Sequence, residues 1–292
     1  MHMWSEIGER ISQETGEKFT ISQHRSVGGG CINQAYEIRE GQRTYFVKLN
    51  QATQISMFEA EAAGLQEIYQ TATIRVPEPI CWGTTSGGQS YLVLEWIELS
   101  RGGNLSWEEM GHQLAALHRI VSQTGFGWHR NNTIGATAQI NPWESDWAKF
   151  FSNHRLSYQL HLAKRRGGNF PQQEELLAAI PQLLSSHQPQ PSLVHGDLWS
   201  GNAAFSQSQE PVLFDPAVYF GDREVDLAMT ELFGGFPKAF YQSYQQAFPL
   251  NSGYEQRKTL YNLYHILNHF NLFGGSYASQ AQGMIQQVLA SV

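Results

Sequence analysis

The chain has 292 residues, of which 41% are hydrophobic and 15% are charged, which is enough for two lobes and a sizeable core. Its net charge of −7, without a basic run, argues against nucleic acid as the main partner. No apolar run is long enough to cross a membrane, and the N-terminus lacks the apolar core of a signal peptide. We therefore expect a cytoplasmic protein without a membrane partner.

The N-terminal part reads as a small antiparallel sheet with one main helix. Apolar spacing predicts a short helix over 4–15, and alternating apolar residues predict strands over 19–27, 31–38 and 44–49. The main helix is expected over 55–70.

Three glycines, Gly28, Gly29 and Gly30, separate the first two strands. Glycine lets backbone N–H groups come close to phosphate oxygens. The pattern Gly28-x-Gly30-x-x-Asn33 is typical of a kinase glycine-rich loop in which Asn33 replaces the third glycine, because Asn tolerates a left-handed backbone. We predict that this segment, including Cys31, covers nucleotide phosphates, although three glycines also form ordinary hairpins.

Lys48, in the strand TYFVKL, is the candidate phosphate-binding lysine, although a strand lysine commonly extends to solvent. The helix over 55–70 carries Glu61 on its apolar face and Glu59 on its polar side. Because an unpaired buried charge is costly, we predict that Glu61 rather than Glu59 pairs with Lys48.

A dense apolar strand over 91–99 leads into the glycine-rich stretch SRGGN, which predicts a lobe boundary. We expect an N-terminal lobe over 1–99 and a C-terminal lobe over 100–292. In kinase-like folds the adenine of the nucleotide forms hydrogen bonds with the backbone at this lobe boundary. We assign these hydrogen bonds to the main-chain groups of Glu95 and Ile97.

The second lobe reads as mostly helical. His118, in its first helix, is interpreted as a core or boundary histidine because nothing supplies a metal partner. The predicted helices span 105–121, 142–162, 171–185, 224–233, 236–248, 254–273 and 277–292.

The stretch over 192–220 carries the strongest chemical signal. Asp197 follows a short apolar run, Asn202 comes five positions later, and Asp215 ends a second β-type run. A lone His-Gly-Asp is often only a turn, but this full spacing is the layout of a kinase catalytic loop and metal-binding strand. Asp197 suits the carboxylate that accepts a hydroxyl proton, whereas Asn202 and Asp215 suit oxygen ligands for Mg²⁺.

At HGDLWSGN, FDPAVYFGDREVDLA and YHILNHFNLFG the chain resembles the fructosamine kinase (ketosamine-3-kinase) family. The resemblance covers nearly the whole chain. It implies an α+β, bilobal protein-kinase-like fold of the aminoglycoside-phosphotransferase type, with a small antiparallel-sheet N-lobe and a larger helical C-lobe. It also implies ATP and Mg²⁺ as cofactors, and phosphorylation of the 3-hydroxyl of a ketosamine, either small or bound to protein. The unstable 3-phosphate then breaks down and frees the amine, which links the family to deglycation.

The resemblance to this family implies the same roles as the spacing does: Asp197 as the base, Asn202 and Asp215 as metal ligands, and Lys48 with Glu61 as the ion pair. It adds Asp226 as an acid that braces the catalytic loop and His195 as structural support. Gly196 replaces the Arg of the protein-kinase motif, and only ten residues separate Asp215 from Asp226. This leaves no room for a peptide-docking activation segment, so a small or locally recognised acceptor fits better.

Three residues are candidates for contact with the acceptor. Trp199 offers a flat apolar face for a sugar, or else fills the core. Asn268 and His269 stand where the family's last long helix approaches the acceptor, and packing explains them equally well. Two other functions stay open: a kinase for another small alcohol, such as an aminoglycoside, choline or homoserine, and a non-catalytic nucleotide-binding protein.

The two cysteines are too few for a disulfide framework and fit no multi-cysteine zinc pattern. Cys31 follows the glycines, where backbone N–H groups stabilise a thiolate, whereas Cys81 looks packed. The resemblance implies redox sensitivity at Cys31, so a monomer and a redox-sensitive homodimer through Cys31 are both expected states. A small residue that merely fits a tight loop is the alternative.

Overall fold

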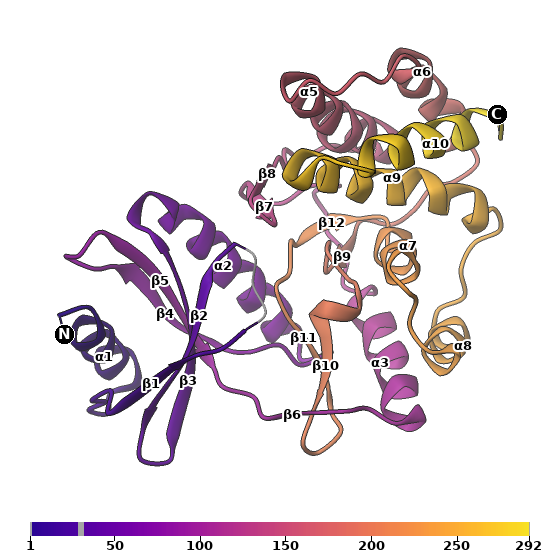
Figure 1. Ribbon diagram of the computed structural model, residues 1–292. Coiled ribbons are helices and arrows are strands. Elements are labelled where there is room, and N and C mark those ends of the chain that lie inside the picture. The colour runs from indigo at the N-terminus through magenta and orange to yellow at the C-terminus, as the bar shows by residue number, and fades with distance from the viewer. Residues whose placement is uncertain (1, 29–31, 292) are drawn as a thin grey trace.

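The computed structural model describes residues 2–28 and 32–291, which form a sheet-rich part and a mostly helical part (Figure 1). The antiparallel strands of the sheet-rich part follow the order β1-β2-β3-β5-β4. Its elements are α1 (His2–Thr15), β1 (Gln23–Ser26), β2 (Gln34–Glu40), β3 (Arg43–Gln51), a 3-10 turn (Ala52–Gln54), α2 (Ile55–Thr71), β4 (Pro79–Thr84) and β5 (Gln89–Glu95).

The sheet lies between α1 and α2 because its strands are apolar on both faces. Val47 and Leu49 of β3 join the cluster that includes Ile7 and Ile11 of α1. Side chains alternate along a strand, so Lys48 points to the opposite face, where α2 packs. The sheet therefore carries Lys48 toward the helical part of the molecule.

The helical part surrounds a core to which most of its helices contribute. The described residues also form three small sheets there, with the strand orders β11-β10-β6, β12-β9 and β7-β8. Its elements are β6 (Leu99–Ser100), α3 (Asn104–Leu117), β7 (Asn132–Ile134), β8 (Thr137–Gln139), α4 (Trp147–Phe150), a π-helical segment (Phe151–Ser157), α5 (Tyr158–Arg165), α6 (Gln173–Leu183), β9 (Ser192–Val194), a 3-10 turn (Ser200–Asn202), β10 (Ala203–Ser206), β11 (Pro211–Leu213), β12 (Tyr219–Gly221), α7 (Glu224–Leu232), α8 (Lys238–Ala247), α9 (Tyr254–Phe273) and α10 (Tyr277–Leu289).

The expected α+β, bilobal architecture is confirmed, but several boundaries differ from the prediction. The strand predicted over 91–99 is two strands: β5 pairs with β3 as far as Glu95, whereas Leu99 pairs with Ser206 in the other part. Of the strand predicted over 19–27, only residues 23–26 form a strand, β1. The segment 29–31 lies outside the described residues.

The helix predicted over 142–162 was wrong at its start. Residues before 146 form extended contacts instead, since Phe126 and Glu144 exchange backbone hydrogen bonds of 2.8 Å. The helix begins after Asp146, whose Oδ1 accepts a hydrogen bond of 2.7 Å from the Lys149 N–H and so caps α4. Among the helices of the described residues, none is long and apolar enough to cross a bilayer.

Gly111 allows α3 and α8 to pack with their backbones in close approach. A Cβ at this position would lie 2.5 Å from the Phe240 carbonyl oxygen and would also clash with Ser243. Gly111→Ala should therefore lower the free energy of unfolding by about 1–3 kcal/mol through overpacking. Denaturant unfolding measures this change.

Gly283→Ala in α10 is the matched control, because nothing lies within 4 Å of a Cβ there. The control should stabilise the protein by about 0.5–1 kcal/mol, since alanine is the better helix former. If both variants shift stability in the same direction, the close approach at Gly111 does not limit packing.

Candidate active site

The segment predicted to be catalytic, here called the catalytic loop, starts where β9 ends, and a buried carboxylate fixes its turn. Asp226, in the first turn of α7, accepts hydrogen bonds from the backbone N–H groups of His195 (2.7 Å) and Gly196 (2.9 Å). Gly196 has φ +82°, and a Cβ there would clash with the Ala217 carbonyl oxygen. Glycine is thus required at this position by the turn itself.

A buried hydrogen-bond network, which the sequence did not predict, holds Asp226 in place. His118 Nε2 lies 3.0 Å from Asp226, and its Nδ1 lies 2.7 Å from the Tyr244 hydroxyl, which also accepts from Arg223 (3.0 Å). Arg223 can only donate, so the Tyr244 hydroxyl donates to Nδ1 and His118 donates from Nε2 to Asp226. The expectation of a buried, satisfied histidine at 118 is confirmed, and its partner is the carboxylate that holds the catalytic loop.

His195 links the catalytic loop to the strand that leads to Asp215. Its Nε2 lies 2.8 Å from the Phe214 carbonyl oxygen and must donate to it, while its Nδ1 accepts from the Asp197 N–H (3.2 Å). Burial lowers the pKa of His195, so the ring is neutral and can make both contacts. The imidazole therefore fixes the spacing between Asp197 and Asp215.

The structure brings Asp197, Asn202 and Asp215 together. Asn202 Nδ2 donates to the Asp197 carbonyl oxygen (2.8 Å) and to its carboxylate (3.3 Å), and the Phe214 N–H donates to the Asn202 carbonyl oxygen (2.9 Å). Asp215 has φ +52°, a left-handed conformation that is uncommon outside glycine and that clusters at functional sites. No described residue donates to Asn202 Oδ1, so this oxygen is available as a ligand.

Lys48 bridges the two parts of the molecule. Its Nζ lies 2.6 Å from Glu61 and 2.6 Å from Asp215. Burial alone would lower the pKa of Lys48, but the carboxylates of Asp215 and Glu61 outweigh burial and raise it. Glu59 instead lies 3.6 Å from Arg130, so the structure places Glu61, not Glu59, beside Lys48.

Asp197 and Asp215 differ in their electrostatic surroundings. Burial raises the pKa of Asp197 to about 7, and the nearby charge of Asp215 adds to the shift. Burial would also raise the pKa of Asp215, but the charge of Lys48 lowers it below its usual range. Asp197 is therefore the carboxylate of the pair that can hold or release a proton near neutral pH.

Only part of the predicted phosphate loop can be placed. Gly28 is exposed, whereas Gly29, Gly30 and Cys31 lie outside the described residues. Asn33 is absent from the described residues with positive φ, so its backbone does not use the left-handed conformation that Asn tolerates. Its side chain instead accepts a hydrogen bond of 2.7 Å from Asn50 Nδ2 and ties the base of the loop to β3.

The predicted adenine contacts, Glu95 and Ile97, lie at the end of β5 and in the segment leading to β6. The Glu95 N–H donates to the Glu78 carbonyl oxygen (2.9 Å), and the Glu95 carboxylate pairs with Arg75 (2.6 Å). Any adenine contact at Glu95 is thus left to its carbonyl oxygen. The other cysteine, Cys81, is buried, and burial raises the pKa of its thiol to about 12, so it is unreactive.

The candidate residues for contact with the acceptor differ in how far they are exposed to solvent. Trp199 is 38% exposed, and its ring lies 6.3 Å from Phe233, which in turn lies 4.9 Å from His269. Sequence reasoning missed Phe233, which has no motif around it. Asn268 is only 2% exposed. Its side chain accepts a hydrogen bond from Gln159 (3.3 Å) and donates one to the Ile134 carbonyl oxygen (3.4 Å), so it packs inside the helical part.

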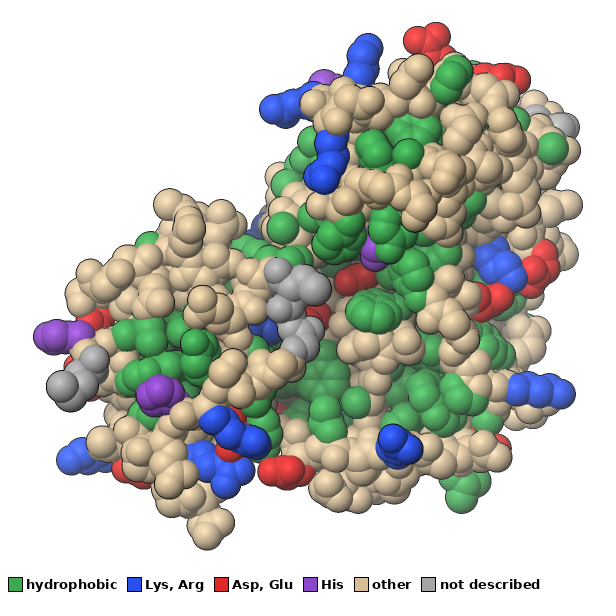
Figure 2. All heavy atoms as spheres, viewed as in Figure 1, with side chains coloured by type: hydrophobic (Ala, Val, Ile, Leu, Met, Phe, Trp, Pro, Cys, Tyr) green, Lys and Arg blue, Asp and Glu red, His purple; other side chains and the backbone are tan. Residues whose placement is uncertain are grey.

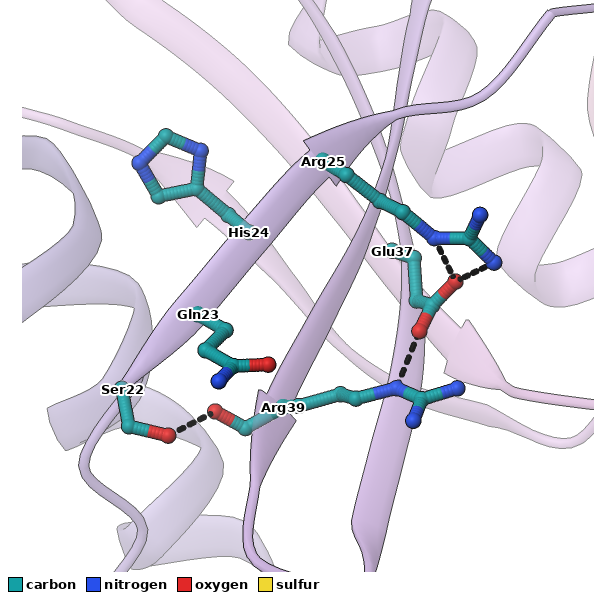
Figure 3. Close-up of a pocket in the computed structure, with 6 residues that line it drawn as sticks. All are labelled: Ser22, Gln23, His24, Arg25, Glu37 and Arg39. Carbon is teal, nitrogen blue, oxygen red and sulfur yellow. Dashed lines mark hydrogen bonds and ion pairs between the residues drawn. The ribbon is translucent and has the colours of Figure 1, made fainter.

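Figure 2 shows a hollow between the two parts of the molecule, with acidic and histidine side chains exposed in it. A separate cavity of about 580 Å³ lies at β1 and β2, where Glu37 is buried between Arg25 and Arg39 (Figure 3). Ala35 of β2 pairs with Lys48 of β3, and Glu37 lies two residues beyond Ala35, so Glu37 and Lys48 are on the same face of the sheet. This cavity contains none of the predicted site residues.

Curated relatives match this chain along nearly its whole length. A protein of Synechocystis named "Probable ketoamine kinase" is 60% identical over 98% of this chain and 97% of its own length. The chloroplastic protein-ribulosamine 3-kinase of Arabidopsis thaliana is 42% identical over 94% of this chain and 85% of its own length.

Solved structures also match along nearly the whole chain. The crystal structure of a candidate fructosamine-3-kinase from Haemophilus somnus matches with a TM-score of 0.93 at 34% identity, covering 99% of this chain and 98% of that one. An aminoglycoside phosphotransferase, at 17% identity and a TM-score of 0.65 over 98% of each chain, shows that the kinase-like fold is shared more widely. The family model for fructosamine kinase matches residues 3–291, and the chain therefore belongs to the fructosamine kinase family.

Proposed function

We propose that this protein transfers the γ-phosphate of ATP to the 3-hydroxyl of ketosamines, such as fructosamine or ribulosamine adducts of amines or lysines. The convergence of Asp197, Asn202, Asp215 and Lys48 supports a phosphoryl transfer, and the names of the relatives support the acceptor. The resulting 3-phosphate breaks down and releases the amine, so the reaction would contribute to protein deglycation.

Each residue of the proposed reaction has one task. Asp197 orients the acceptor hydroxyl and takes its proton, for which a pKa near 7 is well suited. Lys48, oriented by Glu61, binds phosphate oxygens, and the glycine-rich segment that contains Gly28 and Asn33 contributes to the same phosphate site. The backbone at Glu95 and Ile97 binds adenine, at the junction of the two proposed lobes, 1–99 and 100–292.

The donor set also fits Mg²⁺. Asn202 Oδ1 has no donor among the described residues, and the Asp215 side chain is 54% exposed with Lys48 as its ion-pair partner. Mg²⁺ prefers such hard oxygen ligands, usually one or two from the protein together with phosphates and waters. When bound, the ion would neutralise phosphate charge and remove the repulsion between Asp215 and Asp197.

An assay of ADP formation with a panel of acceptors tests the proposal. Fructose, ribulose, erythrulose and psicose adducts of a simple amine are compared with an aminoglycoside, choline and homoserine. We expect acceptor-dependent ADP formation with the ketosamines alone. Activity confined to one of the other alcohols would contradict the proposal, and so would nucleotide binding without any transfer.

Trp199 is proposed to stack on the sugar of the acceptor, because its exposed ring follows Asp197 by two residues. Trp199→Ala should raise the acceptor KM about 10-fold, the effect of one lost stacking contact of about 1.5 kcal/mol. ATP hydrolysis without acceptor should persist. Equal losses with and without acceptor would indicate a folding role instead.

A further inference from the structure

The aromatic residues beside Asp197 continue past Trp199. The Trp199 ring lies edge-on to Phe233 at 6.3 Å, and Phe233 lies 4.9 Å from the imidazole of His269 on α9. The His269 ring then lies 5.1 Å from Tyr277 and 5.7 Å from Phe273, whose side chain is 55% exposed. The rings thus form a continuous row, here called the aromatic row, from the catalytic loop to the surface.

Hydrogen bonding fixes the tautomer of His269. Its Nδ1 lies 2.8 Å from the carbonyl oxygen of His265, one turn earlier in α9. A carbonyl oxygen can only accept, so Nδ1 carries the proton. Burial lowers the pKa of His269, and the imidazole is therefore neutral with a lone pair on Nε2. None of the described residues donates to this nitrogen.

The carboxylate nearest to Phe233 in the sequence already has partners. Glu231, two residues before Phe233, is 2.7 Å from Lys258 and accepts a hydrogen bond of 2.7 Å from the Tyr254 hydroxyl. Asp197 is assigned to the acceptor hydroxyl. A positive charge beside the row would therefore be met by ring faces and by the Nε2 lone pair, not by a free carboxylate.

A ketosamine carries a positive charge that a free ketose lacks, because its secondary amine is protonated at neutral pH. We propose that Phe233 and His269 form the subsite for this ammonium group: Phe233 by cation–π attraction, and His269 Nε2 by accepting an N–H hydrogen bond. This inference rests on the proposed function, and it makes the two residues determinants of the preference for ketosamines over uncharged sugars. The substituent on the amine would then extend past Phe273 into solvent.

A pair of acceptors that differ in one atom isolates the ammonium. N-(1-deoxyfructosyl)butylamine carries the charge, and 1-O-butylfructose replaces the NH₂⁺ by an ether oxygen but keeps the 3-hydroxyl. The measured quantity is the ratio of kcat/KM for the amine to kcat/KM for the ether. We expect wild type to favour the amine. Phe233→Leu should reduce the ratio about 2–30-fold, the range of a cation–π contact.

His269→Leu should reduce the same ratio about 10–100-fold, as expected for loss of a hydrogen bond to a charged group. Phe233→Tyr keeps the ring, and His269→Gln keeps an acceptor, so both should restore most of the ratio and show that folding is intact. His161→Leu, at an exposed histidine of α5, is the matched control and should leave the ratio unchanged.

The outcomes separate this inference from the proposed function. If wild type phosphorylates amine and ether equally, or if both leucine variants lose activity toward the two acceptors in parallel, the ammonium subsite is wrong while the kinase assignment stands. If wild type phosphorylates neither acceptor, nor the corresponding ribulose pair, the proposed function fails and the inference fails with it.

Discussion

Asp197→Asn should lower kcat by roughly 10²–10⁴-fold, the usual range for loss of a general base. The substitution keeps the shape of the side chain but removes the group that accepts the hydroxyl proton. The backbone contacts that position the loop come from Asp226 and His195, so they should persist. ATP affinity should change little, because Lys48 and Asp215 remain.

Steady-state kinetics with saturating ATP and acceptor measure this effect, and nucleotide titration measures binding. Asp146→Asn is the matched control, since Asp146 caps α4 and Asn is an equally good cap. A kcat near the wild-type value for Asp197→Asn would show that another group accepts the proton.

Asp215→Asn should weaken Mg²⁺-dependent nucleotide binding by at least about 10–100-fold, the loss that even residues supporting a metal ligand cause. The charge at this position is balanced by Lys48 at 2.6 Å, and the Asp215 side chain is 54% exposed. The substitution keeps an oxygen but removes the negative charge that makes Asp215 a strong Mg²⁺ ligand, and it leaves Lys48 paired with Glu61. Titration of ATP with and without Mg²⁺ separates the two contributions.

Binding in the presence of EDTA is the internal control for this variant. We expect Asp215→Asn and wild type to bind ATP equally without Mg²⁺. Equal losses with and without the ion would mean that Asp215 acts by shaping the site, through its left-handed backbone, rather than as a ligand.

The sequence was most informative where the chemistry is local. Asp197 and Asn202 are five positions apart on one loop, so their spacing alone indicated a shared site, and Asp215 followed a recognisable strand. Glu61 could be chosen over Glu59 because helical periodicity placed it on the apolar face, and the contact with Lys48 is present. The roles of these residues in catalysis stay predictions.

Long-range partners could not be predicted in the same way. His118 meets Asp226 across 108 positions and Tyr244 across 126, and no local pattern connects them. Phe233 directly follows α7 and no local pattern marks it as a site residue, so only the fold places it between Trp199 and His269.

Local signals also misled where tertiary contacts prevailed. The strand predicted over 91–99 divides because its end pairs with β10 rather than with β3. The helix predicted over 142–162 begins late because backbone bonds between Phe126 and Glu144 hold the preceding segment extended.

The most direct test is to identify the product formed from ATP, Mg²⁺ and a fructosyl or ribulosyl amine. Correlated ¹H–³¹P NMR shows which carbon of the sugar carries the transferred phosphate. We predict a phosphorus signal coupled to the proton on C3, formed by wild type but not by Asp197→Asn, followed by release of the free amine. Phosphate on another hydroxyl, or ATP consumed without any phosphorylated sugar, would contradict this account.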